Sequence, residues 1–348
     1  MTDFSQKLLR WHRHSNKRQM PWKGEKDPYK IWLSEVILQQ TRVEQGWGYY
    51  EKFIQRFPSI CDLAKADDAA VFKLWEGLGY YNRCKNLLFT ARYICKNLHG
   101  KFPEKYEDVL ALKGVGSYTA SAICSFAYNQ PYAVVDGNVF RVLSRIYGIK
   151  KATDSTDGKQ YFTTLAQENL DKKHPALYNQ AIMDFGATVC KPANPACADC
   201  IMNDICIAHQ NGMVNQLPVK EKILSKKTRY LNWFVIVVKN EVLVHLRTGK
   251  DIWQNLNEFY CLETDTKPDW NNESVADYVN NQFSLKPLSI TVSKGFSQQL
   301  THRQIKAVFI SIELQKKPDT LRSYAWLPLD QLSGLAFPKI INEYLEAV

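Results

Sequence analysis

Leu112-Lys113-Gly114-Val115-Gly116-Ser117-Tyr118-Thr119-Ala120 is the stretch of sequence that decides the fold. One helix is expected to end near Ala111, Gly114 and Gly116 turn the chain, and a second helix is expected from Ser117. Glycine permits backbone angles that turn N–H groups outward beside a helix N-terminus, where a phosphate can bind. A lone Gly-x-Gly is usually just a turn. The complete string is typical of a helix–hairpin–helix motif that holds a DNA phosphate without reading the base sequence.

Four of the nine cysteines stand close together, at Cys190, Cys197, Cys200 and Cys206. A zinc site more typically uses pairs of closely spaced cysteines. An uneven run of four suits a cubane iron–sulfur cluster, which binds one thiolate at each corner iron. The alternative is a set of buried or disulfide-bonded cysteines, and a short Pro-containing loop offers little room to bury four. The spacing therefore predicts a metal centre.

Composition indicates a soluble, globular protein. The chain has 348 residues, of which 45% are hydrophobic and 23% charged, which is enough for two domains of ordinary size. No apolar run approaches the length of a membrane span, and the N-terminus has no signal-peptide core. We therefore expect an intracellular protein with reduced cysteines.

The net charge of +10 is unevenly distributed. Residues 230–348 hold 12 of the 45 Lys and Arg but 13 of the 35 Asp and Glu, so the whole positive surplus lies in residues 1–229. A basic region of this kind suggests a polyanionic partner, most often nucleic acid. The alternative is that the surplus only aids solubility.

Periodicity predicts two domains of different class. Residues 1–210 are expected to be mainly helical, residues 211–230 to form a linker, and residues 231–348 to form an α+β domain. Helices are expected from Pro28 and at 49–56, 67–75, 83–98, 104–111, 117–128, 138–147, 159–170, 175–189 and 271–283. Strands are expected at 233–238, 241–246, 289–292 and 306–314.

Two carboxylates are candidates for chemistry. Asp136 follows an apolar segment and precedes an expected helix, so it can be an N-cap, and the helix start should keep it ionised beside a DNA groove. Glu35 lies on an expected helix among apolar neighbours, where desolvation would raise its pKa and let it act as a general acid. Taken alone, the Glu35 segment favours an ordinary surface glutamate.

Together these motifs resemble the helix–hairpin–helix DNA glycosylases of the endonuclease III type, and within them the adenine DNA glycosylases. The resemblance covers nearly the whole chain and is densest up to Cys206. Besides the hairpin and the cysteine run, it rests on Pro21-Trp22, Ser34-Glu35-Val36, Leu38-Gln39-Gln40-Thr41, Gly77-Leu78-Gly79-Tyr80-Tyr81 and Val135-Asp136-Gly137-Asn138.

The resemblance implies the activity and the cofactor. It implies a mostly α-helical glycosylase domain that excises adenine opposite 8-oxoguanine or guanine from double-stranded DNA, in base excision repair. It also implies that Cys190, Cys197, Cys200 and Cys206 hold one [4Fe-4S] cluster.

The same resemblance assigns catalytic roles. Glu35 would protonate the flipped adenine, Asp136 would stabilise the cationic sugar, and Tyr118 and Asn138 would orient these carboxylates. In relatives that also cut the DNA strand, a lysine stands at position 118. A phenol cannot form the Schiff base, so little or no strand cleavage is expected here.

Further residues match DNA- and lesion-binding positions of the family. By resemblance they are Arg18, Gln40, Thr41, Tyr80, Gly114, Gly116, Thr301 and His302. The second domain resembles a Nudix-like lesion-recognition domain, yet it lacks the R-E-x-x-E-E helix that would bind magnesium, so no pyrophosphatase activity is expected. Leu300 stands where the family has an aromatic residue before its Ser-His pair.

We also expect a monomer that does not bind a membrane and that acts in the cytoplasm, associated with the nucleoid if the source is bacterial. Two other functions stay open at this point. One is a glycosylase for mismatched thymine or oxidised pyrimidines on the same scaffold. The other is a non-catalytic DNA-binding protein that uses the cluster only as part of its fold.

Overall fold

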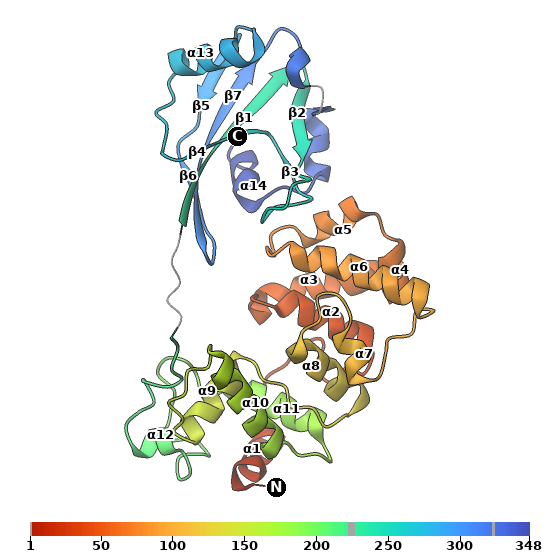
Figure 1. Ribbon diagram of the computed structural model, residues 1–348, viewed down its shortest axis with the longest axis vertical. Coiled ribbons are helices and arrows are strands. Elements are labelled where there is room, and N and C mark those ends of the chain that lie inside the picture. The colour runs from red at the N-terminus through yellow and green to blue at the C-terminus, as the bar shows by residue number, and fades with distance from the viewer. Residues whose placement is uncertain (1, 222–226, 322–323) are drawn as a thin grey trace. The chain divides into compact units, whose positions relative to one another are not determined.

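The computed structural model describes residues 2–221, 227–321 and 324–348 (Figure 1). Contacts divide the chain into two compact units. The first comprises Met1–Lys65 and Lys85–Ile223, and the second comprises Ala66–Cys84 and Leu224–Val348. The second unit therefore includes a segment from the helical part of the chain.

The predicted division into residues 1–210, 211–230 and 231–348 runs strictly along the chain and stays a prediction. Residues 222–226 of the predicted linker lie outside the described residues. The first strand begins at Lys227, which falls inside that predicted linker.

The predicted fold class is confirmed, with helices in the first part of the chain and an α+β arrangement in the last. The helices before the sheet are α1 Asp3–His14, α2 Pro28–Leu38, α3 Val43–Arg56, α4 Ile60–Lys65, α5 Asp68–Trp75, α6 Asn82–Asn97, α7 Tyr106–Leu110, α8 Ser117–Tyr128, α9 Gly137–Ile146, α10 Thr156–Asn169, α11 Pro175–Thr188 and α12 Ile207–Gln210. Periodicity predicts most of these helices but not α1, α4 and α12.

Helix α2 carries Glu35 through the interior of the first unit. Asp27 caps its N-terminus by accepting a hydrogen bond from the Tyr29 N–H, and Pro28 occupies the first turn, where no N–H is needed. Nearly every residue from Tyr29 to Ile37 is buried. A helix that is apolar on all sides belongs in a core, and Glu35 is therefore carried into it.

The glycine hairpin between α7 and α8 has the expected position, but its two glycines differ. Gly114 has φ +82°, and a Cβ there would meet the Asn86 side chain at 2.7 Å. Gly116 caps α8 with φ −99°, which any residue can adopt, and nothing lies within 4 Å of where its Cβ would be. The expected need for special backbone angles thus holds for Gly114 and is wrong for Gly116, which instead leaves open space at the helix start.

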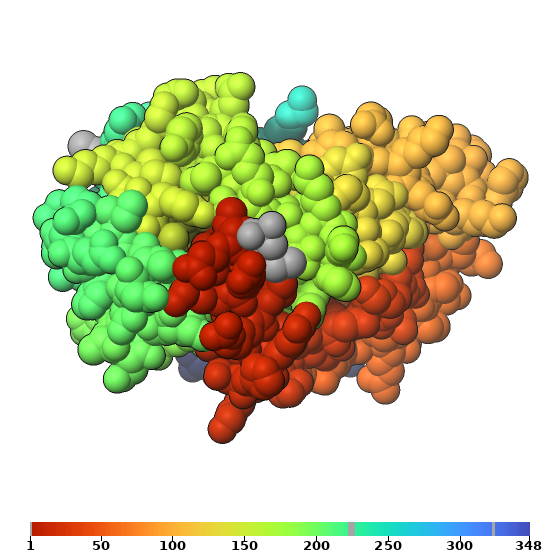
Figure 2. Space-filling model, turned by 90° about the horizontal axis from the view of Figure 1, so that it is seen from below, coloured from red at the N-terminus to blue at the C-terminus, as the bar shows by residue number. Residues whose placement is uncertain are grey.

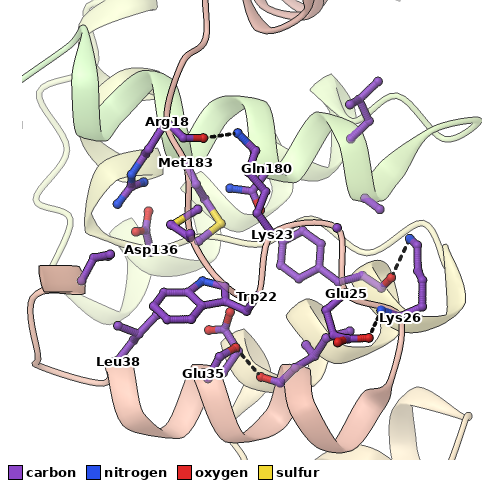
Figure 3. A pocket seen from close by; sticks show the side chains of 18 of the residues that line it. Arg18, Trp22, Lys23, Glu25, Lys26, Glu35, Leu38, Asp136, Gln180 and Met183 are labelled. Carbon is purple, nitrogen blue, oxygen red and sulfur yellow. Dashed lines mark hydrogen bonds between the residues drawn. The ribbon is translucent and has the colours of Figure 1, made fainter. Parts of the chain in front are cut away.

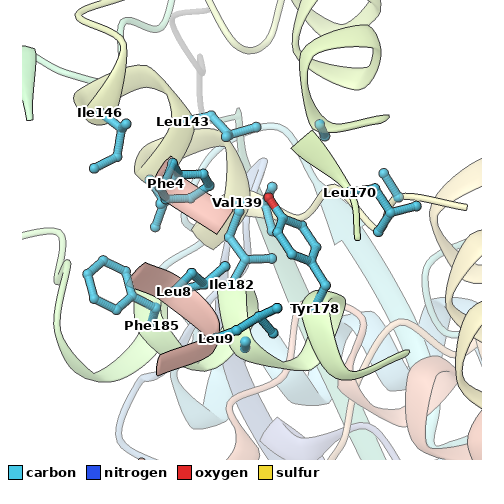
Figure 4. Close-up of a cluster of buried hydrophobic side chains, with 14 of the residues drawn as sticks. Phe4, Leu8, Leu9, Val139, Leu143, Ile146, Leu170, Tyr178, Ile182 and Phe185 are labelled. Carbon is cyan, nitrogen blue, oxygen red and sulfur yellow. The ribbon is translucent and has the colours of Figure 1, made fainter. Parts of the chain in front are cut away.

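The core of the first unit joins three helices that are distant in sequence (Figure 4). Side chains from α1, α9 and α11 pack together, among them Phe4, Leu8, Leu9, Val139, Leu143, Ile146, Tyr178, Ile182 and Phe185. Cys190, Cys200 and Cys206 pack against this cluster. In Figure 2 the N-terminal segment, in red, lies between the green cysteine region and the yellow-green helical segments, and Lys7 pairs with Asp204 at 2.7 Å.

The described part of the second unit forms an eight-stranded sheet. Its elements are β1 Lys227–Val238, β2 Glu241–Leu246, β3 Asn257–Glu258, β4 Tyr260–Thr264, α13 Asn272–Phe283, β5 Ser289–Val292, β6 Phe296–Gln299, β7 Arg303–Glu313, β8 Ala325–Pro328 and α14 Lys339–Leu345, with 3-10 turns η1 Asp319–Leu321 and η2 Leu329–Gly334. The main strand order is β3-β2-β1-β7-β5, and β1 and β7 run parallel while the other pairs are antiparallel.

Alternate residues of β1 and β7 face different helices. Phe234 and Ile310 belong to a cluster with Val279 of α13. Phe309 stacks on Trp233 at 5.2 Å and on Tyr344 of α14 at 4.1 Å between ring centroids. Because successive strand side chains point to opposite faces, the sheet is covered by α13 on one face and α14 on the other.

Among the described residues is a disulfide that the sequence did not predict. Cys61 of α4 and Cys95 of α6 are bonded, with Cα atoms 5.3 Å apart. The expectation of reduced cysteines is therefore wrong for this pair. Within the described ranges, no helix is long and apolar enough to span a bilayer.

Candidate active site

A cavity of about 550 Å³ opens into the first unit between α2 and α11 (Figure 3). Figure 3 shows Glu35 rising from α2 while Gln180 and Met183 reach in from α11. The predicted residues that line this cavity are Arg18, Glu35, Thr41, Tyr118, Asp136 and Asn138. The structure thus brings together side chains that lie up to 120 positions apart in sequence.

Glu35 is buried, with 6% of its surface exposed. Burial raises the pKa of Glu35 from its ordinary 4.5 to about 7; a hydrogen bond with Tyr118 lowers that pKa, and the charge of Asp136 raises it. A carboxyl group that titrates near neutral pH can both donate and accept a proton under the same conditions. The interpretation of Glu35 as a surface residue, which its own segment favoured, is therefore wrong.

Asp136 caps α9, where its side chain accepts a hydrogen bond from the Val139 N–H at 2.8 Å. The Asn138 amide donates to the other carboxylate oxygen at 2.7 Å. Burial nevertheless raises the pKa of Asp136, and these hydrogen bonds and the charge of Arg141 oppose the rise. Desolvation therefore has a larger effect on this pKa than the helix N-terminus, which favours the ionised form.

Tyr118 is the hydrogen-bond partner of Glu35 at the start of α8. Burial raises the pKa of its phenol well above the ordinary value, so Tyr118 stays protonated. Lys113, the nearest lysine in sequence, does not line the cavity, and its ammonium lies 4.2 Å from the centre of the Phe89 ring. The wall around position 118 therefore offers no amine from the hairpin.

Helix α9 links Asp136 to the cysteine region through two buried arginines that the sequence analysis missed. Arg141 donates to the Asn138 side-chain oxygen and to the Cys190 carbonyl, both at 2.8 Å. Arg145 donates to the Lys191 carbonyl at 2.7 Å. No signal in the sequence marks their burial, because both lie on the side of α9 opposite its apolar residues, where arginine is expected to be exposed.

All four clustered cysteines line one small cavity beside α9 and α11. The Met202 N–H points at the Cys200 sulfur at 3.4 Å, and the Arg145 guanidinium lies 3.5 Å from the Cys190 sulfur. Among the described residues, no group of three or more metal-ligating side chains is close enough to hold a single ion. Four thiols around one cavity do fit a cluster that binds each thiolate at a different iron.

The remaining predicted residues lie outside the cavity. Gln40 is exposed with φ +61° just after α2, and the hairpin glycines do not contribute to the lining. In the second unit, Thr301 and His302 are exposed at the tip of the β6–β7 hairpin. Tyr80, 45% exposed with φ +50°, forms a hydrogen bond with the Thr301 hydroxyl within that unit.

The cavity wall also contains residues to which the sequence analysis gave no role. Trp22, Lys23, Gln180 and Met183 line it, and Asp184 lies directly behind them. The available signal was that Asp184 is the one charged residue of helix α11.

Comparisons with known proteins agree with this fold. A family model described as HhH-GPD superfamily base excision DNA repair protein matches residues 33–167, and a NUDIX domain model matches residues 232–347. The chain is similar to the structure of a thermostable thymine-DNA glycosylase, with TM-score 0.55 and 27% identity over 60% of this chain and 95% of that one. An endonuclease III–DNA complex, 18% identical with TM-score 0.51, has the same fold. The chain therefore belongs to the class of helix–hairpin–helix base-excision repair proteins that also have a NUDIX domain.

Similar proteins that are named adenine DNA glycosylase identify the family within this class. The chain is 32% identical over 359 residues to the adenine DNA glycosylase of Buchnera aphidicola subsp. Schizaphis graminum, covering 99% of this chain and 98% of that protein. It is 41% identical over 226 residues to the adenine DNA glycosylase of Homo sapiens, covering 62% of this chain and 41% of that protein. The chain belongs to the adenine DNA glycosylase family.

Proposed function

We propose that this protein is a monofunctional glycosylase that removes adenine from double-stranded DNA in which adenine is mispaired with 8-oxoguanine or guanine. The observation that carries the proposal is the buried Glu35, with a pKa of about 7, in the same cavity as Asp136. The adenine DNA glycosylase activity of the relatives supports the same reaction. The adenine must leave the DNA double helix before the reaction, because its glycosidic bond is inaccessible inside a duplex.

In the proposed reaction, Glu35 first gives up one proton and later takes up another. Glu35 donates its proton to N7 of the flipped adenine, and the glycosidic electron pair leaves with the base. The sugar becomes an oxocarbenium-like cation, which the Asp136 carboxylate stabilises electrostatically or by a transient covalent bond. Water then adds to the sugar, and Glu35 takes up the released proton. Tyr118 and Asn138 hold the two carboxylates in place through their hydrogen bonds.

We propose that the DNA strand stays largely uncut. Strand cleavage by the bifunctional relatives needs an amine that attacks the sugar, and Tyr118 occupies the corresponding position. Lys113 is held over Phe89 instead of lining the cavity.

DNA and lesion contacts are proposed for residues outside the carboxylate pair. Gly114 and Gly116 would receive a phosphate at the start of α8, while Arg18 and Thr41 would contact the flipped base. Gln40 and Tyr80 would fill the space that the base leaves in the stack. Thr301 and His302 would recognise 8-oxoguanine, with Leu300 supplying contact but no aromatic stacking. We propose that the protein acts as a monomer in the cytoplasm, associated with the nucleoid if the source is bacterial.

We also propose that Cys190, Cys197, Cys200 and Cys206 hold a [4Fe-4S] cluster. When bound, the cluster would fix the loop that Arg141 and Arg145 fasten to α9, the helix that Asp136 caps. Its contribution to the reaction is therefore structural in this proposal.

The experiment that tests the function is a panel of duplexes incubated with the protein. Adenine opposite 8-oxoguanine and opposite guanine should release free adenine, and the strand should break only after alkali treatment. Duplexes with thymine opposite guanine or with oxidised pyrimidines should release no base. This result would exclude a glycosylase for mismatched thymine or oxidised pyrimidines on the same scaffold. Binding without release of any base would support the non-catalytic alternative and overturn the proposal.

The pH dependence of base release should report the Glu35 pKa. Protonated Glu35 is the acid, so the single-turnover rate constant should fall about tenfold per pH unit above pH 7. The Tyr118 hydrogen bond lowers this pKa, so in Tyr118→Phe the fall should begin at a higher pH. Tyr128→Phe is the control, because that hydroxyl bonds the Phe102 carbonyl outside the cavity. A profile that moves to lower pH in Tyr118→Phe would contradict the assignment.

Removing one cluster thiol should release iron. We expect Cys200→Ser to lose most of the four iron and four sulfide atoms per chain, measured by elemental and sulfide analysis, because one corner iron lacks its ligand. Cys261→Ser is the control, since Cys261 is a free cysteine of the second unit. Equal iron content in Cys200→Ser and the unsubstituted protein would exclude this ligand set.

A further inference from the structure

Asp184 of α11 is a fully buried carboxylate with four side-chain donors around it. Arg18 donates to one oxygen at 3.0 Å, and the Gln180 amide donates to the same oxygen at 3.0 Å. Asn16 donates to the other oxygen at 2.8 Å, and the Lys23 ammonium lies 3.1 Å from it. A buried carboxylate is tolerated only with such partners, so these five side chains form one unit.

Three of the four donors come from the segment between α1 and α2. This segment has no long helix or strand of its own, yet its Arg18 and Lys23 form part of the cavity wall. The Lys23 ammonium also donates to the Arg18 carbonyl at 2.7 Å, a hydrogen bond within the segment (Figure 3). Asp184 does not line the cavity, so it acts on the cavity only through the residues that it holds.

The group contains two cations and one anion. Its formal charge is therefore +1, and loss of the Asp184 charge would make it +2. In the proposed reaction, positive charge develops on the protonated adenine and then on the sugar. A second uncompensated cation in the cavity wall would raise the energy of both, because charges away from bulk water are poorly screened.

We propose that Asp184 is a positioning residue which holds Arg18 and Lys23 in the cavity wall and offsets one of their charges while the substrate becomes cationic. This inference deepens the proposed adenine removal and rests on it. A purely structural Asp184 would instead serve only to keep the segment between α1 and α2 folded, and its removal would have the same effect whatever charge Lys23 carries.

A double-mutant cycle separates the two roles. Single-turnover release of adenine opposite 8-oxoguanine is measured for the unsubstituted protein, Asp184→Asn, Lys23→Gln and the double variant, with thermal unfolding as a check that each is folded. We expect Asp184→Asn to slow adenine release at least about tenfold when residue 23 is Lys, but less than about threefold when it is Gln. In the double variant the group has a formal charge of +1, the same as in the unsubstituted protein. The same factor in both backgrounds would overturn the proposal.

The test includes a control aspartate and a second pair of variants in case Asp184→Asn does not fold. Asp157→Asn removes an aspartate that pairs with Lys151 away from the cavity, and release should stay within about twofold of the unsubstituted rate. If Asp184→Asn does not fold, the double variant is compared with Lys23→Gln alone, and a loss above about threefold overturns the proposal. Failure of the unsubstituted protein to release adenine from any duplex would instead refute the proposed function, so the two failures are distinguishable.

Discussion

Glu35→Gln is expected to bind DNA with adenine opposite 8-oxoguanine while releasing adenine about 10²–10⁴ times more slowly than the unsubstituted protein. Glutamine keeps the shape of the side chain but has no acidic proton to give to adenine. The measurement is single-turnover base release together with duplex affinity. Affinity should change little, because Glu35 is buried in the cavity and not on the protein surface.

The same substitution should make the protein more stable at alkaline pH. The pKa of Glu35 is raised from 4.5 to about 7 in the folded protein, so its stabilising contribution is complete below pH 4.5 and is lost as the pH rises through 7. At pH 8 the buried, ionised Glu35 opposes folding, and Glu35→Gln should raise the free energy of unfolding by up to about 3 kcal/mol. At pH 4 the gain should vanish.

Denaturant unfolding at the two pH values measures this effect. Glu51→Gln is the matched control, since Glu51 is an exposed carboxylate that bonds Trp47 outside the cavity. An equal change in unfolding free energy at pH 4 and pH 8 would mean that Glu35 does not titrate between these pH values.

The release experiment has its own contradicting outcome. If Glu35→Gln released adenine at a rate close to that of the unsubstituted protein, Glu35 would not be the general acid.

The second large effect is expected at Asp136. Asp136→Asn should slow adenine release by about 10²–10³-fold, since it removes the negative charge that faces the developing sugar cation. Asparagine is as good an N-cap as aspartate, so α9 should keep its start and the fold should survive. Single-turnover rates and thermal unfolding, measured together, separate the lost charge from lost structure.

A change of leaving group distinguishes the two carboxylates. With an adenine analogue that leaves readily without protonation, the Glu35→Gln rate should recover towards that of the unsubstituted protein. The Asp136→Asn rate should not, because the sugar cation forms whichever base departs. Asp67→Asn serves as the control for removal of an N-cap carboxylate, since Asp67 caps α5 in the second unit. Equal recovery in both variants would contradict the separate roles.

Local patterns predicted the elements of the fold better than their grouping. Spacing predicted α2, α6, α8 and α11 because capping residues and apolar periodicity are properties of short segments. The membership of Ala66–Cys84 in the second unit was not predictable in this way. It depends on contacts such as the hydrogen bond from the Phe337 N–H to Glu76 at 2.8 Å, across 261 positions.

The sequence by itself determined which chemical groups the protein has: a glycine hairpin, four cysteines in one run, and a tyrosine at position 118 with two carboxylates elsewhere in the chain. Only the tertiary structure decided how these groups behave. Packing around α2 raised the Glu35 pKa, although its own segment favoured an exposed residue. Likewise, Asp184 meets Arg18 only because α11 folds against a segment 166 positions earlier. The reason is that desolvation and charge pairing depend on neighbours in space, and most of those neighbours are distant in sequence.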